Sequence, residues 1–239
     1  MYDAIVARLV LVHGSVSNGA MTWGSQRPLA DRWELVALDR PGFPPGPAVA
    51  RVDFELDAVW LAELLEPGDH LCGHSYGGVV ALLAAAGFPA LGSLTVIEPP
   101  ATRAAVGVPA AEEFGAAAER IWQEGPADPE LFLRGFLQAV GSAWDPPTPL
   151  PPPLAQGAEA LRRERGPWEA EIPVDELRTL PFPKLVVSGA HHNAFDAICD
   201  ALERDLDAER VVLPGAGHAV QRAPGFNEAL AGFLERAAR

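Results

Sequence analysis

The residues with the clearest chemical potential lie in the segment Gly73–Gly78, which reads GHSYGG. Ser75 has a glycine two positions away on either side, as in a serine nucleophile held on a sharp strand-to-helix turn. An ordinary glycine-rich turn is the alternative. With seven serines and 23 glycines, chance places G-x-S-x-G about 0.07 times in such a chain, so the flanking elements must decide.

The flanking sequence favours the nucleophile. The apolar run 70–72 predicts a short strand before Ser75, and residues 75–86 predict an apolar helix after it. Gly73 and Gly77 fit this turn because a side chain at either position would meet neighbouring backbone. The helix N-terminus also places unpaired N–H groups near Ser75, where negative charge would develop during acyl transfer.

A serine needs a general base, and His218 is the best candidate among six histidines. It follows the strand predicted at 210–213, in the glycine-rich sequence PGAGH. We expect His13 to shape the loop after the first strand and His74 to point away from the nucleophile. The remaining histidines, His70, His191 and His192, are interpreted as polar loop or strand-end residues, and no metal site is expected.

Alternating strands and helices predict an α/β fold with a mostly parallel sheet of about six strands, covered by helices on both faces. The predicted strands are 5–12, 33–39, 70–72, 93–98, 184–189 and 210–213. Residues 1–100 and 183–239 form the predicted core domain. Residues 101–182 show helical patterns only, broken by the proline-rich run 145–153, and we expect them to form a helical cap over the carboxyl ends of the strands.

The composition of the chain argues against several classes of partner and location. The net charge of −14 argues against nucleic acid as a partner, since phosphate binding needs a basic face. Cys72 and Cys199 have no metal spacing and are compatible with a reducing cytoplasm. The first residues lack the pattern of a signal peptide, and no run of about 18 apolar residues suggests a membrane span. We therefore expect a cytoplasmic protein, either a monomer or a homodimer.

Several segments together resemble the α/β-hydrolase superfamily over nearly the whole chain. They are LVLVHG, VALDRPGF, LCGHSYGGVVAL, the helical insert after VIEPP, KLVVSG and LPGAGH. The resemblance, to the serine hydrolase branch with a helical cap, implies Ser75 as nucleophile and His218 as base. It also implies an oxyanion hole formed by the backbone N–H of Tyr76 and one from Ser15 or Val16.

The sequence departs from the family pattern in two ways. Only 12 residues precede His13, which indicates a shortened N-terminal region and a sheet of six strands, or seven at most. Relatives usually carry an aspartate about three residues after the KLVVSG strand, but residues 190–193 read AHHN. Glu98 stands at the end of the strand predicted at 93–98, where some relatives place their acid, and is preferred over Asp196, which lies at a helix start.

Ser75, His218 and Glu98 together predict hydrolysis of an ester, lactone or thioester through a Ser-His-acid triad, with no cofactor or metal. Carbon–carbon bond hydrolysis, lyase or cyclase chemistry, and non-catalytic ligand binding on the same fold stay open. The expected substrate is small and hydrophobic, because the cap offers aromatic residues, including Phe114, Phe132 and Trp168. The predicted pocket residues are His13, Gly14, Met21, Trp23, Phe43, His74, Trp122, Phe136 and Trp144.

Overall fold

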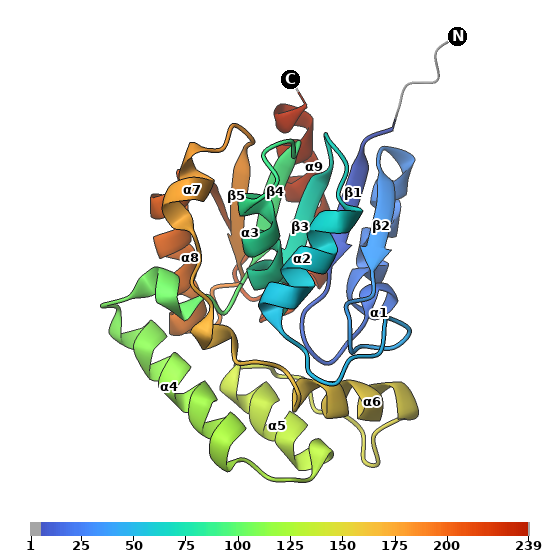
Figure 1. Cartoon of the computed structure of the whole chain (residues 1–239), viewed down its shortest axis with the longest axis vertical. Coiled ribbons are helices and arrows are strands. Elements are labelled where there is room, and N and C mark those ends of the chain that lie inside the picture. The colour runs from blue at the N-terminus through green and yellow to red at the C-terminus, as the bar shows by residue number, and fades with distance from the viewer. Residues whose placement is uncertain (1–5, 239) are drawn as a thin grey trace.

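The computed structural model of the chain describes residues 6–238. Within them, six parallel strands form one sheet in the order β2-β1-β3-β4-β5-β6 (Figure 1). The strands are β1 (Arg8–Val12), β2 (Glu34–Leu38), β3 (His70–His74), β4 (Ser93–Ile97), β5 (Lys184–Ser188) and β6 (Glu209–Val212). The predicted α/β class and the six-stranded parallel sheet are therefore confirmed. Ile5, the first residue of the predicted first strand, lies outside the described residues.

Helices cover both faces of this sheet (Figure 1). On one face lie α2 (Phe54–Leu64), α3 (Tyr76–Ala86) and α8 (Asn193–Leu206), whose buried side chains share one apolar cluster with the strands. On the other face, α9 (Phe226–Ala237) packs with α1 (Gly19–Trp23) and the 3₁₀ helix η1 (Gly24–Asp31) in a second cluster. This layering explains why β3, β4 and β5 are buried along their whole length.

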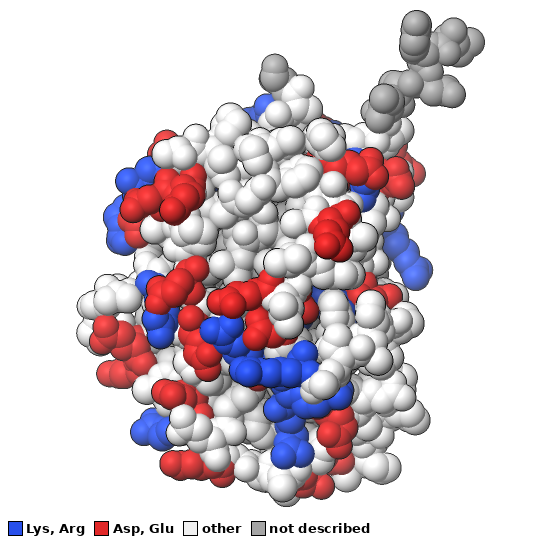
Figure 2. Space-filling model, viewed as in Figure 1, with Lys and Arg blue, Asp and Glu red and all other residues white. Residues whose placement is uncertain are grey.

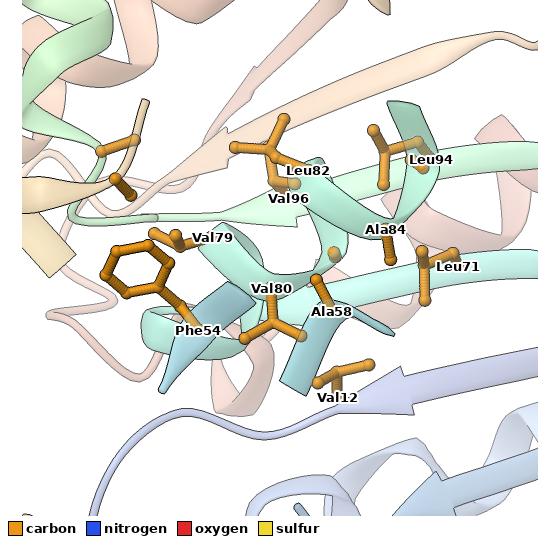
Figure 3. Packing of buried hydrophobic residues seen from close by; sticks show 14 of the residues in the cluster. Val12, Phe54, Ala58, Leu71, Val79, Val80, Leu82, Ala84, Leu94 and Val96 are labelled. Carbon is orange, nitrogen blue, oxygen red and sulfur yellow. The ribbon is translucent and has the colours of Figure 1, made fainter. Parts of the chain in front are cut away.

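The helix that follows Ser75 packs at the centre of the larger cluster. Figure 3 shows Leu82 of α3 beside Val96 of β4, and Val79 and Val80 of α3 near Phe54 of α2. All five side chains are buried to 99% or more. Burial of one such side chain stabilises the fold by roughly 1.5–3 kcal/mol. The start of α3, and therefore Ser75, is thus held by a rigid part of the core.

The segment between β4 and β5, all of it described, contains helices and no strand. It comprises the 3₁₀ helices η2 (Thr102–Ala105) and η3 (Pro167–Glu169) and the helices α4 (Pro109–Glu124), α5 (Pro129–Ala139), α6 (Pro152–Leu161) and α7 (Val174–Thr179). Figure 1 shows α4, α5 and α6 beyond the carboxyl ends of the strands, whereas α7 lies beside α8. We refer to this segment as the cap, although its function as a lid stays a prediction.

Charged side chains of both signs are visible on the surface of the protein (Figure 2). Figure 2 shows acidic side chains spread over the viewed face, and arginine or lysine side chains gathered in its lower half. The large negative charge is thus not confined to one patch of that face. None of the helices in residues 6–238 is both long and apolar enough to cross a lipid bilayer.

Candidate active site

Ser75 sits on a strained turn between β3 and α3. Its backbone has φ 54° and ψ −125°, a left-handed φ that non-glycine residues rarely adopt. The Ser75 N–H donates to the Ile97 carbonyl at 2.8 Å, which fixes the turn to β4. Such strain persists only where the surrounding structure imposes it, and it is concentrated at functional sites.

Glycines make this turn possible. A Cβ atom on Gly73 would lie 2.3 Å from the Gly77 carbonyl oxygen, and one on Gly77 would lie 2.3 Å from the His13 carbonyl oxygen. Gly14 has the same constraint, because its Cβ would come within 2.9 Å of the Ser75 Cβ. The predicted pocket residue Gly14 therefore provides backbone that abuts the serine, and a larger residue there would displace it.

Ser75, His218 and Glu98 form a hydrogen-bonded chain. The Ser75 hydroxyl lies 3.0 Å from His218 Nε2, and His218 Nδ1 lies 2.7 Å from Glu98 Oε2. His218 comes from the loop after β6, and Glu98 directly follows β4. When the imidazole is neutral, its Nδ1–H donates a hydrogen bond to Glu98, and its Nε2 accepts one from the Ser75 hydroxyl. This arrangement can remove a proton from the serine and stabilise the resulting imidazolium.

Backbone geometry aims the Glu98 carboxylate at this chain. Glu98 has φ 44°, and its N–H donates to the Val187 carbonyl at 3.0 Å. Its other oxygen, Oε1, accepts from the Gly189 N–H at 2.7 Å and lies 3.2 Å from His191 Nδ1. Although burial alone would raise the pKa of Glu98, the hydrogen bonds from His191 and His218 lower that pKa to about 2. Glu98 is therefore ionised at neutral pH.

Asp196 occupies a different environment. It lies in the first turn of α8, where its Oδ1 accepts from the Ser188 hydroxyl at 2.9 Å. In the described chain, the carboxyl group hydrogen-bonded to His218 is that of Glu98 and not that of Asp196. The geometry thus favours Glu98 as the acid, the residue preferred from the sequence.

His74 packs next to His218 and holds its backbone by a hydrogen bond. Its Nε2–H donates to the His218 carbonyl at 2.9 Å, and the two rings lie 5.0 Å apart. Burial, together with the nearby His218 ring, lowers the pKa of His74 to about 3, so His74 is neutral. The side chain lines the larger cavity described below and also orients the loop that carries the base.

Three predicted pocket residues, His13, Trp23 and Phe43, are buried and do not line either of the two cavities beside Ser75. His13 Nδ1–H donates to the Gly14 carbonyl at 2.7 Å, and Nε2 accepts from the Arg40 N–H at 2.9 Å. The Phe43 ring packs edge-on against His13, and Trp23 belongs to the apolar cluster under α9. These residues hold the loops that surround the serine, as we expected for His13.

A buried ionic cluster, which the sequence reading missed, joins the cap to the loop after β1. Arg40, fully buried, contacts Asp57 at 3.0 Å and Glu164 at 3.3 Å, and donates to the Gly14 carbonyl at 3.1 Å. Glu164, which follows α6, also accepts a hydrogen bond from the Ser15 hydroxyl at 2.5 Å. Burial raises the pKa of Glu164 to about 7, against the pull of Arg40. We name Ser15, Arg40, Asp57 and Glu164 the Arg40 cluster.

Replacing Arg40 by methionine should lower the free energy of unfolding by about 3–5 kcal/mol, because the two buried carboxylates would lose the cation that both contact. Urea denaturation at pH 8, where Glu164 is mostly ionised, measures the effect. The matched control is Arg163→Met, an exposed arginine whose guanidinium reaches the Val49 carbonyl at 3.4 Å. A loss for Arg40→Met no larger than that of the control would contradict the role given to the cluster.

The predicted oxyanion residues surround Ser75. Tyr76 is the first residue of α3, and its phenol is directed away from the serine, donating to the Arg165 carbonyl at 3.1 Å. Ser15 lines both cavities beside Ser75, and Val16 has a left-handed φ of 73°. Their role as N–H donors to an oxyanion stays a prediction.

One group of side chains in the described part of the chain has the spacing of a metal site. The ligand atoms of Glu98, His191 and His218 lie within 4.8 Å of one another. Both oxygens of Glu98 are already engaged by N–H donors, from Gly189 and the two imidazoles. These three side chains therefore fit a hydrogen-bonded network better than a bound metal ion.

Two cavities meet at Ser75. One, of about 30 Å³, lies under the cap and is mostly apolar; the other, of about 290 Å³, opens beside the exposed residues Met21 and Trp144. Of the predicted pocket residues, Trp122 lines the small cavity, Phe136 lines both, and Met21, His74 and Trp144 line the large one. Further lining residues of the small cavity are Phe114, Ile121, Trp168 and Phe195. Phe132 instead packs in the interior of the cap.

Comparison with known proteins places this geometry in context. A family model described as the alpha/beta hydrolase family matches residues 9–229. Pimeloyl-(acyl-carrier protein) methyl ester esterase of Aeromonas hydrophila subsp. hydrophila is 42% identical over 77 residues. That stretch covers 30% of this chain and 30% of the esterase.

Solved structures share the whole fold. MenH from S. aureus superposes with a TM-score of 0.75 at 18% identity, covering 100% of this chain and 97% of MenH. A thermophilic esterase from Thermogutta terrifontis gives a TM-score of 0.65 at 27% identity, covering 98% of this chain and 91% of the esterase. Because the family match spans nearly all of the described residues, the chain belongs to the alpha/beta hydrolase family.

Proposed function

We propose that this protein is a serine hydrolase that cleaves an ester, lactone or thioester of a small, largely apolar substrate. The observation that carries the proposal is the hydrogen-bonded chain from Ser75 through His218 to Glu98. Similarity to the Thermogutta esterase and, over a short stretch, to a methyl ester esterase supports ester chemistry.

In the proposed reaction, Ser75 Oγ attacks the substrate carbonyl carbon while His218 Nε2 takes the hydroxyl proton. The N–H of Tyr76, with that of Ser15 or Val16, stabilises the oxyanion of the tetrahedral intermediate. His218 then gives the proton to the leaving oxygen or sulfur, which departs and leaves an acyl group on Ser75. Water, deprotonated by His218, attacks this acyl-enzyme; the intermediate collapses, releasing the acid and returning the proton to Ser75.

The two cavities suggest how the substrate is placed. The small cavity under the cap is lined by aromatic side chains, including Trp122 and Trp168, and would take the acyl group. The larger cavity opens beside Met21 and Trp144, both about half exposed, and would take the leaving group and release it. Phe136 lies at the boundary because it lines both.

Replacing Phe136 by alanine should therefore shift the preference towards longer acyl chains. We expect the ratio of kcat/KM for octanoyl over acetyl esters to rise about 10-fold, because removing the ring joins the two spaces. The ratio is independent of the folded fraction, so a modest loss of stability does not affect it. Leu131→Ala, an exposed position on the same helix, is the control. An unchanged ratio would argue against Phe136 as a limit on chain length.

The proposed function is tested with p-nitrophenyl esters of increasing acyl length, a matching series of acyl thioesters, and γ- and δ-lactones. We expect turnover of at least one series by the wild-type chain and none above background by Ser75→Ala. Turnover that survives in Ser75→Ala would overturn the proposal, as would failure of every series together with tight binding of an apolar ligand, which would indicate a binding protein.

A further inference from the structure

A second histidine contacts the acid, through the carboxylate oxygen that the base does not contact. His191, in the loop between β5 and α8, directs Nδ1 to Glu98 Oε1 at 3.2 Å. Its Nε2 lies 3.1 Å from the carbonyl oxygen of Val140, the residue that ends α5 in the cap. One imidazole therefore spans the gap between the acid and the cap.

Both partners of this ring are acceptors, since a carboxylate and a carbonyl oxygen have no proton to donate. A neutral imidazole has one N–H and one lone pair, so it would satisfy one contact and face the other with a lone pair. The imidazolium has two N–H groups and satisfies both. The geometry therefore selects the protonated form of His191.

The surroundings of His191 fit a largely buried cation. Its side chain is 10% exposed, and its ring stacks on Phe195 at 5.8 Å and an interplanar angle of 20°. The charged or titratable groups around it are Glu98, Asp196 of α8, and the rings of His218 and His192 at 5.8 and 6.1 Å. On the cap side it meets Val140 and Gly141, which carry no charge.

We propose that His191, as a cation, is a positioning residue that holds Glu98 towards His218 and fastens the end of α5 over the site. This role rests on the proposed hydrolase function, because Glu98 matters there through His218. It also couples the cap to the acid: Val140 lines both cavities, so the same ring that orients Glu98 fixes part of the substrate wall.

The pH dependence follows from the direction of the shift. Burial opposes the charge on His191, but the hydrogen bond and attraction to Glu98 raise its pKa above 6.5. The stabilisation that this contact contributes is complete below the unfolded-state pKa of about 6.5, and it is lost as the pH rises through the folded-state pKa. Above that pH, one of the two contacts breaks.

His191 also influences the base. Its positive charge offsets part of the negative charge of Glu98, which otherwise favours the imidazolium form of His218. His191→Gln still offers an N–H to Glu98 but carries no charge. The acidic limb of its kcat/KM profile should therefore lie at higher pH than that of the wild-type chain.

Histidine side-chain titration by ¹H–¹⁵N NMR tests the proposal without a substrate, alongside the kcat/KM profile. His192→Asn is the matched control, because asparagine can also cap α8 where His192 now accepts from the Ala194 N–H. We expect His191 of the wild-type chain to titrate above 6.5, and the acidic limb of the kcat/KM profile to move to higher pH in His191→Gln but not in His192→Asn.

A wild-type His191 that titrates at or below 6.5 would overturn the proposal, and this result needs no variant. So would an acidic limb of the kcat/KM profile that lies at the same pH in His191→Gln as in the wild-type chain. If no ester, thioester or lactone is turned over, the proposed function fails, and the NMR titrations still decide the placement of the charge on His191.

Discussion

Replacing Ser75 by alanine is expected to lower kcat/KM for the best ester substrate by about 10⁵-fold or more, because no other group can form the acyl-enzyme. The fold should persist. The Ser75 hydroxyl contacts only His218 among the described residues, and the backbone bonds of the turn do not involve it. The change should therefore leave the free energy of unfolding within about 1 kcal/mol.

Steady-state rates and urea denaturation on the same preparations measure both parts of this expectation. Ser93→Ala is a suitable control, because Ser93 begins β4 at the end of the strand opposite Glu98 and hydrogen-bonds to His70 at 2.9 Å. We expect the control to keep the wild-type rate. Retention of more than about one per cent of the activity by Ser75→Ala would contradict a nucleophilic role for this serine.

Replacing Glu98 by glutamine should lower turnover by about 10³- to 10⁴-fold, whereas Asp196→Asn should change it by about threefold or less. A glutamine amide can donate to His218 Nδ1, which stabilises the tautomer that carries its proton on Nε2. That tautomer has no lone pair for the Ser75 proton. Asp196 instead bonds to Ser188, so its loss leaves the His218 tautomer unchanged.

Parallel kinetics of the two variants distinguish the acids. Near-UV circular dichroism of Glu98→Gln verifies that the loss is chemical, since Glu98 also anchors the Gly189 N–H. If Asp196→Asn lost activity by orders of magnitude while Glu98→Gln stayed active, the assignment of the acid would be reversed.

The elements around Ser75 could be predicted because strand, turn and helix each leave a local pattern. The run before Gly73 and the apolar helix that begins at Tyr76 are continuous in sequence, and Gly73 is required by a contact with Gly77, four residues away. The contact that requires Gly77, with the His13 carbonyl oxygen, is distant in sequence and appears only in the fold. Glu98 was identifiable for a related reason: it ends a strand, and in a parallel sheet all strands end at the same edge.

The rest of the site depends on side-chain directions in loops, which carry no periodicity. His191 and His192 are adjacent and chemically identical, yet one contacts Glu98 and the other caps α8. Arg40 stands in a proline- and glycine-rich stretch typical of exposed turns, but it is fully buried because Asp57 and Glu164, 17 and 124 residues away, compensate its charge. Partners so distant in sequence become visible only in the folded chain.

The same limitation applies to the predicted pocket residues Trp23 and Phe43. Trp23, the last residue of α1, and Phe43, between β2 and α2, belong to segments that follow strands β1 and β2, which suggested contact with substrate. Each ring is instead 3% exposed or less, with Trp23 turned into the cluster under α9 and Phe43 packed on His13. A large aromatic side chain beside a site is buried in whichever apolar region it can reach, and the sequence alone does not specify that region.

Labelling by a fluorophosphonate, followed by intact-mass measurement and peptide mapping, tests most directly whether Ser75 is a nucleophile activated by His218. The wild-type chain should acquire one adduct, on Ser75. His218→Ala should label far more slowly, and Ser75→Ala should not label at all. An unlabelled wild-type chain, or equal labelling of Ser75→Ala at another residue, would contradict the account.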